Sequence, residues 1–509
     1  MSPSLTTDVL ITGAGPAGLL LACELAAEGI DTTVIERDAE RPQRSRGFNL
    51  NARSLDLLAR RGLAAPFLAE GWPTPHGPFT GLPVALPMPG AATDHPFTLG
   101  IPQLRIEQIL EEHALGHGAR LLRGHRLTAL DQGPEGTTAR ADGPDGPVEI
   151  TAGHTVGCDG GRSTVRKQAG VGFPGTEASS WTLLGDVVPA DTDALPPGPA
   201  AGPGGDVLVL PRTGYVRVLL ADPDPPADRD APVTPEGFAR ALEHALGRPV
   251  PLAEHLWLTR FGDAARLADR YRAGRVLLAG DAAHVHPPAG AVGVNVAIED
   301  AHNLGWKLAR TVRGSAPEGL LDSYEAERRP AAERVLAATR AQALLAGRDP
   351  ALEPLKDLLT RVFDRPAAAT ALAESLLGLD TAHPMGAADP GAHPWLGRLA
   401  PDLDLVADGR RTRLSALVAG RRPLLLAFNG ADLPLPERAE AAGAAVVRAQ
   451  CGDPQGAEAV LLRPDGHTAW VRARGGRATG ELEDALARWC GTAGGRLSAP
   501  ATGPVPGGR

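Results

Sequence analysis

The sequence predicts an α/β fold in which a Rossmann-type dinucleotide-binding domain carries an inserted, mainly antiparallel β-sheet domain and is followed by a third domain. Residues 8–36 have the pattern of a strand, a glycine-rich turn, a helix and a second strand. Residues 174–260 carry β-type runs that Pro-rich loops separate. A linker rich in Gly, Pro and Asp at 384–394 precedes further strand patterns and a last helix. A chain of 509 residues has room for about three domains.

The opening glycine-rich turn predicts a dinucleotide site. An apolar strand at 9–12 runs into the motif GAGPAG. Within it, Gly13 makes the tight turn, Gly15 lets the backbone approach a pyrophosphate, and Gly18 lets the helix pack closely on the strand. The second strand ends on Glu36, which can accept hydrogen bonds from ribose hydroxyls. A purely structural glycine turn is the alternative interpretation.

Two later strand patterns also lead into an aspartate. One precedes Asp159 in an Asp-Gly-Gly turn, and the other, at 275–280, ends on Asp281. A carboxylate fixed at such a turn can accept hydrogen bonds from ribose or ribityl hydroxyls, although an Asp-Gly turn without a ligand is the alternative for Asp159. His284 and His286 follow Asp281, but two adjacent prolines and the lack of further ligands argue against a metal site.

Composition and charge exclude several classes of protein. The formal net charge is −9 and basic residues form no runs, which argues against a nucleic-acid partner. No apolar stretch approaches the roughly 20 residues of a membrane span, and no export signal opens the chain. The four cysteines, Cys23, Cys158, Cys451 and Cys490, are too scattered for a disulfide framework or a zinc site. We therefore expect a cytoplasmic protein with no metal, no nucleic acid and no membrane partner.

Three motifs occur in a fixed order: GAGPAG near the start, GCDGGRSTVRK in the middle and AGDAAHVHPPAG later. This combination resembles the group A FAD-dependent aromatic monooxygenases of the para-hydroxybenzoate hydroxylase fold, in the branch of aromatic polyketide hydroxylases and rifampicin monooxygenases. The resemblance implies an FAD-binding domain over 1–72, 101–173 and 271–385, and a substrate-binding sheet domain over 73–100 and 174–270. It also implies a thioredoxin-like domain without redox cysteines over 391–491 and a flexible tail at 492–509.

The resemblance assigns cofactor contacts residue by residue. It assigns Gly13, Gly15 and Gly18 to the FAD pyrophosphate and Glu36 to the adenosine ribose, and it counts Arg37 among the cofactor-binding residues. Arg46 and Gln103 match positions that approach the flavin, with Arg105 assisting; from the residues alone, Arg46 is equally well explained as a phosphate-binding arginine or as solvated surface. Asp159 is implicated in both FAD and NAD(P)H binding, and Asp281 in binding the ribityl chain. The flavin loop comprises Pro288, Gly290, Ala291, Val292, Gly293, Val294 and Asn295.

The implied activity is hydroxylation of a polycyclic aromatic polyketide in antibiotic biosynthesis. FAD, transiently bound NADPH or NADH, and O₂ would act through a C4a-hydroperoxyflavin, and no acid–base residue is singled out. The substrate pocket is expected between the flavin domain and the inserted sheet, with Trp181, Arg212 and Tyr215 as candidate walls. The alternatives are an antibiotic-inactivating monooxygenase, a Baeyer–Villiger oxygenase and, from another class, a redox-neutral or accessory flavoprotein. The last is favoured by Ala291-Val292, where the branch usually has Gly-Gln. The oligomeric state stays open.

Overall fold

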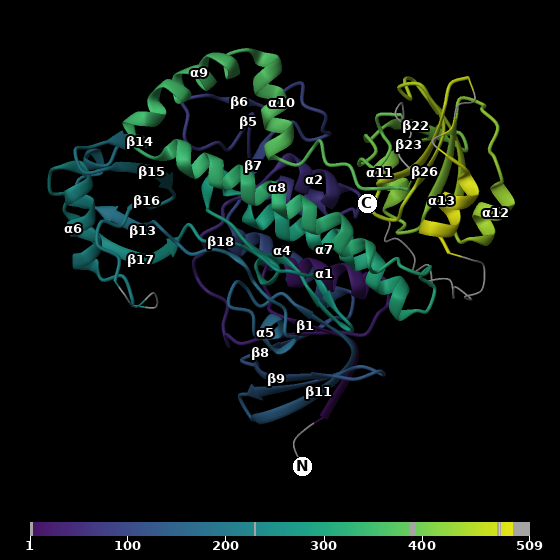
Figure 1. The fold of residues 1–509 in the computed structure, drawn as a ribbon, viewed down its shortest axis with the longest axis horizontal. Coiled ribbons are helices and arrows are strands. Elements are labelled where there is room, and N and C mark those ends of the chain that lie inside the picture. Colours follow the sequence, from purple (N-terminus) through teal and green to yellow (C-terminus); the bar gives the residue numbers. More distant parts are fainter. Residues whose placement is uncertain are drawn as a thin grey trace, which may run out of the picture.

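The structure, a computed structural model, describes residues 4–491 apart from 227, 229, 230, 387–392, 476, 477 and 479. The predicted tail at 492–509 and the first two residues of the predicted third domain lie outside the described residues. The chain forms a central α/β body, a β-sheet lobe on one side of it and a second lobe, built from the C-terminal part of the chain, on the other (Figure 1). No helix among the described residues is both long and apolar enough to cross a bilayer.

The central body is built on a large, mostly parallel sheet. Its strand order is β19-β20-β11-β1-β2-β8, and β10 and β9 extend it from β11 as an antiparallel meander. Strands β20, β11, β1, β2 and β8 pair in parallel, so their carboxyl ends lie at one edge. The bounds are β1 Ser4–Thr12, β2 Thr32–Glu36, β8 Arg120–Arg123, β9 Arg126–Gln132, β10 Thr137–Gly143, β11 Gly146–Gly157, β19 Arg272–Ala273 and β20 Val276–Leu278.

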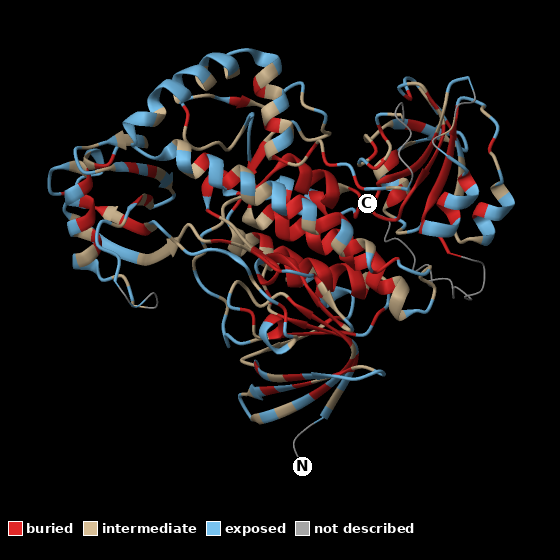
Figure 2. Ribbon diagram, in the orientation of Figure 1, coloured by how far each residue is buried: buried red, intermediate tan, exposed pale blue. Residues whose placement is uncertain are grey.

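Helix α1 (Pro16–Ala27) is almost wholly buried between this sheet and α7 (Gly293–Val312), because all of its residues except Glu24 are apolar. In Figure 2 both helices are largely red, the colour of buried residues. The other helices of the body are α2 Ala52–Ala59, α3 Ala64–Glu70, α4 Gln103–Gly116, α5 Thr164–Gln168 and α8 Ser323–Ala346. Short strands complete it: β3 Asn49–Leu50, β4 Trp72–Thr74, β5 His76–Gly77, β6 Leu86–Pro87, β7 Thr98–Gly100, β12 Gly175–Thr176, β18 Ala265–Leu267 and β21 His284–Val285.

The inserted lobe is a five-stranded antiparallel sheet in the order β14-β15-β16-β13-β17. Helix α6 (Pro235–Leu246) covers one face through an apolar cluster that includes Leu183, Val218 and Phe238. Residues 73–100, which the sequence grouped with this sheet, contribute none of its strands; β4 pairs with β7, and β5 with β6. The strand bounds are β13 Trp181–Pro189, β14 Gly198–Ala201, β15 Asp206–Arg212, β16 Tyr215–Ala221 and β17 Leu252–Gly262.

The C-terminal lobe is a six-stranded mixed sheet in the order β23-β22-β25-β24-β26-β27. Strands β24 and β25 are parallel and α12 connects them, whereas β26 and β27 run antiparallel beside β24. All four cysteines are free thiols. The bounds are β22 Asp404–Ala407, β23 Arg410–Arg413, α11 Leu414–Val418, β24 Leu424–Phe428, α12 Pro436–Ala441, β25 Ala445–Cys451, β26 Ala457–Leu462, β27 Thr468–Ala473 and α13 Leu482–Trp489.

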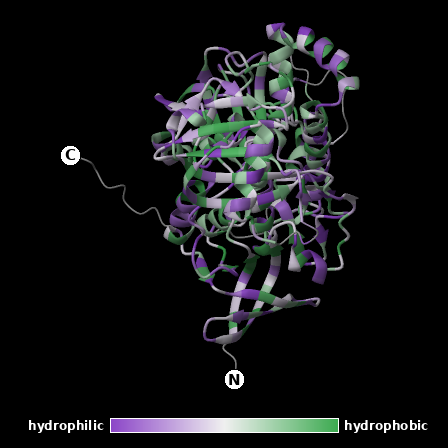
Figure 3. Ribbon diagram, turned by 90° about the vertical axis from the view of Figure 1, so that its left-hand side faces the viewer, coloured by the Kyte–Doolittle hydropathy of each residue, from purple (hydrophilic) through white to green (hydrophobic). Residues whose placement is uncertain are grey.

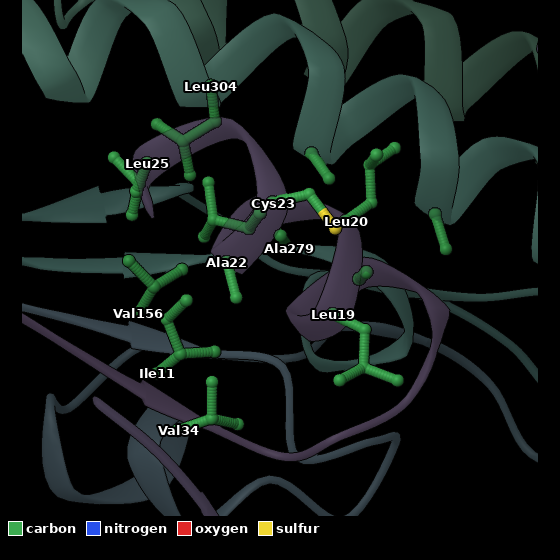
Figure 4. Close-up of a cluster of buried hydrophobic side chains, with 14 of the residues drawn as sticks. Ile11, Leu19, Leu20, Ala22, Cys23, Leu25, Val34, Val156, Ala279 and Leu304 are labelled. Carbon is green, nitrogen blue, oxygen red and sulfur yellow. The ribbon is translucent and has the colours of Figure 1, made fainter. Parts of the chain in front are cut away.

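Two helices, α9 (Glu353–Phe363) and α10 (Pro366–Leu376), connect the central body to the C-terminal lobe. Pro366 begins the second helix, because proline suits the first position of a helix and not its interior. Viewed from the side in Figure 3, strands inside the molecule are largely hydrophobic, whereas outer helices alternate hydrophilic and hydrophobic segments. Figure 4 shows the central core, in which Leu19 and Cys23 of α1 belong to the same apolar cluster as Ile11, Val34 and Leu304.

Candidate functional site

Three of the sequence motifs meet at the carboxyl edge of the large sheet. Gly13 follows β1, Asp159 follows β11, and Gly280 follows β20. The first two turns are in contact, since a Cβ built on Gly13 would lie 2.3 Å from the carbonyl oxygen of Cys158. The third turn adjoins the first helix, since a Cβ on Gly280 would lie 3.1 Å from that of Ala17. In open α/β sheets this edge is where ligands bind.

The glycine-rich turn has the properties of a pyrophosphate cradle. Gly13 has φ +105°, a conformation that side chains rarely adopt, and a Cβ on Gly18 would lie 2.0 Å from the Gly13 carbonyl oxygen. Gly15 is different, because a Cβ there would meet no atom within 4 Å. Gly15 also caps α1 without any side-chain hydrogen bond. Open space therefore adjoins a helix N-terminus that carries uncapped N–H groups, and both suit a phosphate anion.

Glu36, at the end of β2, holds the glycine-rich turn in place. Its Oε2 accepts from the Ala14 N–H at 2.8 Å, and its Oε1 accepts from the Asp38 N–H at 3.0 Å. Arg37 projects into solvent, with its Nε 3.6 Å from an Asp38 carboxylate oxygen. Glu36 thus lies at the predicted ribose position while also stabilising the loop, and each of its oxygens keeps a lone pair for a further donor.

Asp159 caps α5. Its Oδ2 accepts from the N–H groups of Thr164 at 2.6 Å and Val165 at 3.1 Å. Its Oδ1 is buried and has no hydrogen-bond partner among the described residues. Burial raises the pKa of this carboxyl, and hydrogen bonds from Ser163, Val165 and Thr164 oppose that shift. A buried unpaired acceptor is costly, so Oδ1 fits a donor such as a hydroxyl or amide of a bound cofactor.

The predicted flavin-side residues cluster around Gly47. Its N–H donates to the Gln103 side-chain oxygen at 3.2 Å, and a Cβ on Gly47 would lie 2.8 Å from Val294. The Arg46 guanidinium donates to Thr259 Oγ1 at 3.2 Å. Desolvation lowers the pKa of that guanidinium, and the carboxylate of Asp281 opposes the shift. Arg46, Gln103, Asp281 and Val294 therefore surround one region.

Two residues of the flavin loop have left-handed backbone conformations. Gly290 has φ +74° and Ala291 has φ +50°, so the alanine occupies a conformation that costs an L-residue about 1 kcal/mol. Pro288 and Ala291 are exposed, Val292 is buried, and Gly293 begins α7. The loop is connected to the body by Asn295, whose Oδ1 accepts from the Asn51 N–H and from Ser54 Oγ, both at 2.8 Å.

Arg105 lies apart from this cluster. Its guanidinium forms two hydrogen bonds with the carboxylate of Glu70, at 2.6 and 2.8 Å, on the partly exposed face of α4. Sequence reasoning missed Thr80 and Gln342, which hold the flavin loop: Thr80 Oγ1 accepts from the Gly290 N–H at 3.3 Å, and Gln342 Oε1 accepts from the Thr80 N–H at 3.1 Å. No local motif marks either residue, because both contacts join distant segments.

His284 and His286 have partners other than a metal. His284 Nε2 hydrogen-bonds Asp300 Oδ2 at 2.6 Å, and His286 Nδ1 lies 2.8 Å from the Pro287 carbonyl oxygen. Burial lowers the pKa of His286. Across the described residues, no group of three or more His, Cys, Asp or Glu side chains is arranged to hold a metal ion.

A cavity of about 620 Å³ lies between the 43–48 loop and the inserted sheet. Arg44, Arg212, Tyr215 and Arg217 line it together with Trp72, whereas the other candidate wall, Trp181, does not. Buried Asp186 pairs with Arg44 at 3.2 Å and binds Arg217 through two hydrogen bonds, at 2.8 and 3.0 Å.

Within the described part of the chain, Arg212 is the cavity arginine that has no carboxylate partner. Its guanidinium lies 3.5 Å from the ring centroid of Phe48. Its Nε and Nη2 are buried and have no hydrogen-bond partner within the part of the chain that the structure describes. Desolvation lowers the pKa of this guanidinium, and Arg217 lowers it further. The cavity thus combines aromatic surface with an unsatisfied cationic donor, a combination that suits a planar ligand with an anionic oxygen.

Comparisons with known proteins agree with this site. Residues 6–339 match the FAD binding domain family, and residues 393–493 match the family described as aromatic-ring hydroxylase, C-terminal. The 12-dehydrotetracycline 5-monooxygenase/anhydrotetracycline 6-monooxygenase of Streptomyces rimosus is 42% identical over 95% of this chain and 99% of its own. The solved structure of OxyS anhydrotetracycline hydroxylase from Streptomyces rimosus superposes with a TM-score of 0.89, at 41% identity over 96% of this chain and 99% of that chain.

A relative of another kind is also similar over its whole length. The dialkyldecalin synthase of Streptomyces rugosporus is 36% identical over 96% of this chain and 100% of its own. Together the comparisons confirm the predicted fold class and family resemblance, and they confirm FAD as the cofactor.

Proposed function

Because this chain belongs to the family of FAD-dependent aromatic-ring monooxygenases, we propose that it uses NADPH or NADH to hydroxylate a polycyclic aromatic polyketide in antibiotic biosynthesis. The observation that carries the proposal is the arginine-lined cavity between the 43–48 loop and the inserted sheet, beside the predicted flavin region. Its volume of about 620 Å³ lies within the range of small-molecule sites. The free thiols suit the reducing cytoplasm, where we place the protein.

We assign each part of the site a task. The N-terminus of α1 binds the pyrophosphate of FAD, Glu36 and Asp159 accept from its hydroxyls, and Asp281 binds the ribityl chain. The chemistry that FAD would supply when bound is its own reduction by the pyridine nucleotide and the activation of O₂. The protein positions the ring through the flavin loop and excludes water, while Arg212 and the aromatic walls orient the substrate.

Substrate-dependent consumption of reductant tests this function. NADPH or NADH oxidation is followed in air with a panel of polycyclic aromatics, including anhydrotetracycline, and the masses of the products are determined by mass spectrometry. A product one oxygen heavier, formed only with reductant and O₂, is the expected result. A ring-expanded product in which the oxygen lies beside a carbonyl would indicate a Baeyer–Villiger reaction, and loss of antibiotic potency in a mature drug would indicate inactivation.

Replacement of Arg212 by leucine is expected to raise KM for the aromatic substrate about 10- to 100-fold, because a hydrogen bond to a charged group contributes about 1.5–3 kcal/mol. KM for NAD(P)H should stay unchanged, as should every constant in the control Arg140→Leu, which alters an exposed arginine of β10. If KM for NAD(P)H rose instead, the cavity would belong to the phosphates of the reductant.

A redox-neutral flavoprotein is the second candidate function. Its support is the left-handed conformation of Ala291 and the apolar Val292 in the flavin loop, together with the similarity to a dialkyldecalin synthase. Conversion of a substrate without consumption of NAD(P)H or O₂ would favour this candidate over the monooxygenase.

The Val292→Gln variant probes the loop directly. A glutamine supplies a hydrogen-bonding side chain where valine has none, and a hydrogen bond contributes about 0.5–1.5 kcal/mol. We expect the share of NAD(P)H that ends as H₂O₂ to fall about 2- to 10-fold, with FAD content unchanged. Ala291→Gly, which only relieves the backbone, serves as the control. If the native chain and both variants convert the same share of NAD(P)H to H₂O₂, then Ala291-Val292 in place of Gly-Gln has no effect on the reaction.

A further inference from the structure

We infer that the turn between β26 and β27, in the C-terminal lobe, positions the flavin site. This turn comprises Arg463–His467 and is called the buried turn below. Each of its residues is buried, although it connects two strands of the C-terminal lobe. Connecting turns normally lie at the surface, because their backbone polar groups need partners. Here the partners come from helices of the FAD-binding body.

The buried turn contacts α2 and α7 as well as the chain just beyond α2. The Pro464 carbonyl oxygen accepts from Arg61 Nη1 at 2.8 Å. The Asp465 carboxylate accepts from the Trp306 indole N–H at 3.1 Å, and its backbone oxygen lies 3.1 Å from His302 Nε2. His467 Nε2 lies 2.9 Å from Arg53 Nη2.

The strongest contact is with α8. Arg463 donates to both carboxylate oxygens of Glu327, at 2.7 and 3.0 Å, and neither side chain is exposed to solvent by more than 1%. Burial would raise the pKa of Glu327, but Arg463 and Lys307 hold it well below its ordinary value. Such a desolvated two-point ion pair is rigid, and loss of one partner leaves a buried charge without compensation.

From Glu327 the contacts continue to the turn at Gly280 and Asp281. Arg328, the next residue on α8, donates to Asp300 at 2.8 Å and to Glu299 at 2.9 Å. The other oxygen of Asp300 accepts from the Gly280 N–H at 3.0 Å and lies 2.6 Å from His284 Nε2. Gly280 directly precedes Asp281, so three successive contacts join the buried turn to the proposed ribityl-binding residue.

A second route leads to the flavin loop. Arg53, the partner of His467, belongs to α2, which Asn51 caps through its side chain. The Asn51 N–H donates to Asn295 at the end of the loop. The two routes start at the buried turn and reach the two ends of the segment 280–295. The C-terminal lobe therefore has a positioning role, because it fixes this segment against both FAD and substrate.

The inference rests on the proposed placement of FAD at this segment, and FAD release from the holoenzyme tests it. Arg463→Lys keeps the charge and loses the second hydrogen bond to Glu327. Arg328→Lys also keeps the charge, but it loses the guanidinium geometry that lets Arg328 bind Asp300 and Glu299 together. Recovery of FAD fluorescence after dilution gives the release rate, which we expect to rise about tenfold in each variant. Since both lie on one route, the double variant should release FAD no faster than the faster single variant.

The control is Arg310→Met, which breaks another contact between the central body and the C-terminal lobe. Arg310 of α7 donates to the carbonyl oxygens of Trp489 and Cys490. It should lower the urea midpoint of unfolding as much as Arg463→Lys does and leave FAD release unchanged. Equal release rates in Arg463→Lys, Arg310→Met and the native chain would overturn the inference, and so would additive effects in the double variant.

Asp281→Ala separates failure of this inference from failure of the site. If that variant purifies depleted in flavin while Arg463→Lys releases FAD at the native rate, the placement of FAD holds and the positioning role is wrong. If Asp281→Ala binds FAD normally, the placement itself is wrong, and the routes described above end at another part of the molecule.

Discussion

Replacement of Gly15 by alanine is expected to weaken FAD binding about 100-fold, or about 2.8 kcal/mol, without destabilising the protein. The added Cβ would meet no protein atom within 4 Å, so the fold has room for it. The space it would fill adjoins the uncapped N-terminus of α1, where we place the pyrophosphate. A methyl group there holds the phosphates away from N–H donors whose charge-assisted hydrogen bonds contribute about 1.5–3 kcal/mol each.

Gly13→Ala is the matched control, because its Cβ would lie 2.3 Å from the Cys158 carbonyl oxygen and its φ is +105°. That variant should lose stability as well as FAD. Isothermal titration of the flavin-free proteins with FAD, together with their urea midpoints, checks both expectations. An unchanged FAD affinity in Gly15→Ala would place the pyrophosphate elsewhere.

Features that a short segment determines could be predicted from the sequence. The strand–turn–helix of residues 8–36 is of this kind, since three glycines and two apolar strands specify it locally, and the parallel sheet then brings Asp159 and Gly280 to the same edge. The segment 288–295 stands out by its motif, and Ala291 does adopt the left-handed conformation that glycine would take without strain.

Features that depend on distant contacts could not be predicted. Arg105 matches a family position, and nothing local in the sequence signals that Glu70, 35 residues away, binds its guanidinium. Nothing local in the sequence signals that Glu327 and Arg61 bury the turn at Pro464-Asp465-Gly466. Likewise, Thr80 and Gln342 reach the flavin loop from segments with no motif of their own.

Acidification is expected to destabilise the contact between the C-terminal lobe and the central body, beginning near pH 6.5. Burial lowers the pKa of His302 and His383, and it lowers that of His467 to about 4. Between pH 6.5 and 4 the unfolded chain therefore binds protons that the folded chain does not, so stability falls as the pH falls. His467 alone accounts for about 2 kcal/mol between pH 6.5 and 5.

Protonation of buried carboxylates lowers the folding stability further at lower pH. Burial would raise the pKa of Glu327 and Asp465, but Arg463 beside both holds it well below the ordinary value, so their stabilisation is lost as the pH falls below about 4.5. His154 in β11, with a pKa lowered to about 4 by burial, adds to the loss in the central body. Only the difference between the native chain and a His467 variant therefore reports on the buried turn.

The His467→Gln variant provides that difference. Neutral His467 presents Nε2 to Arg53 at 2.9 Å, and protonation would put an N–H against that guanidinium. A glutamine oxygen can accept the same hydrogen bond at every pH. We expect the urea midpoint of the variant to fall less than that of the native chain between pH 7.5 and 5, whereas His244→Gln, on the exposed face of α6, should follow the native chain. Parallel curves for all three proteins would mean that the buried turn stays docked whatever the charge of His467.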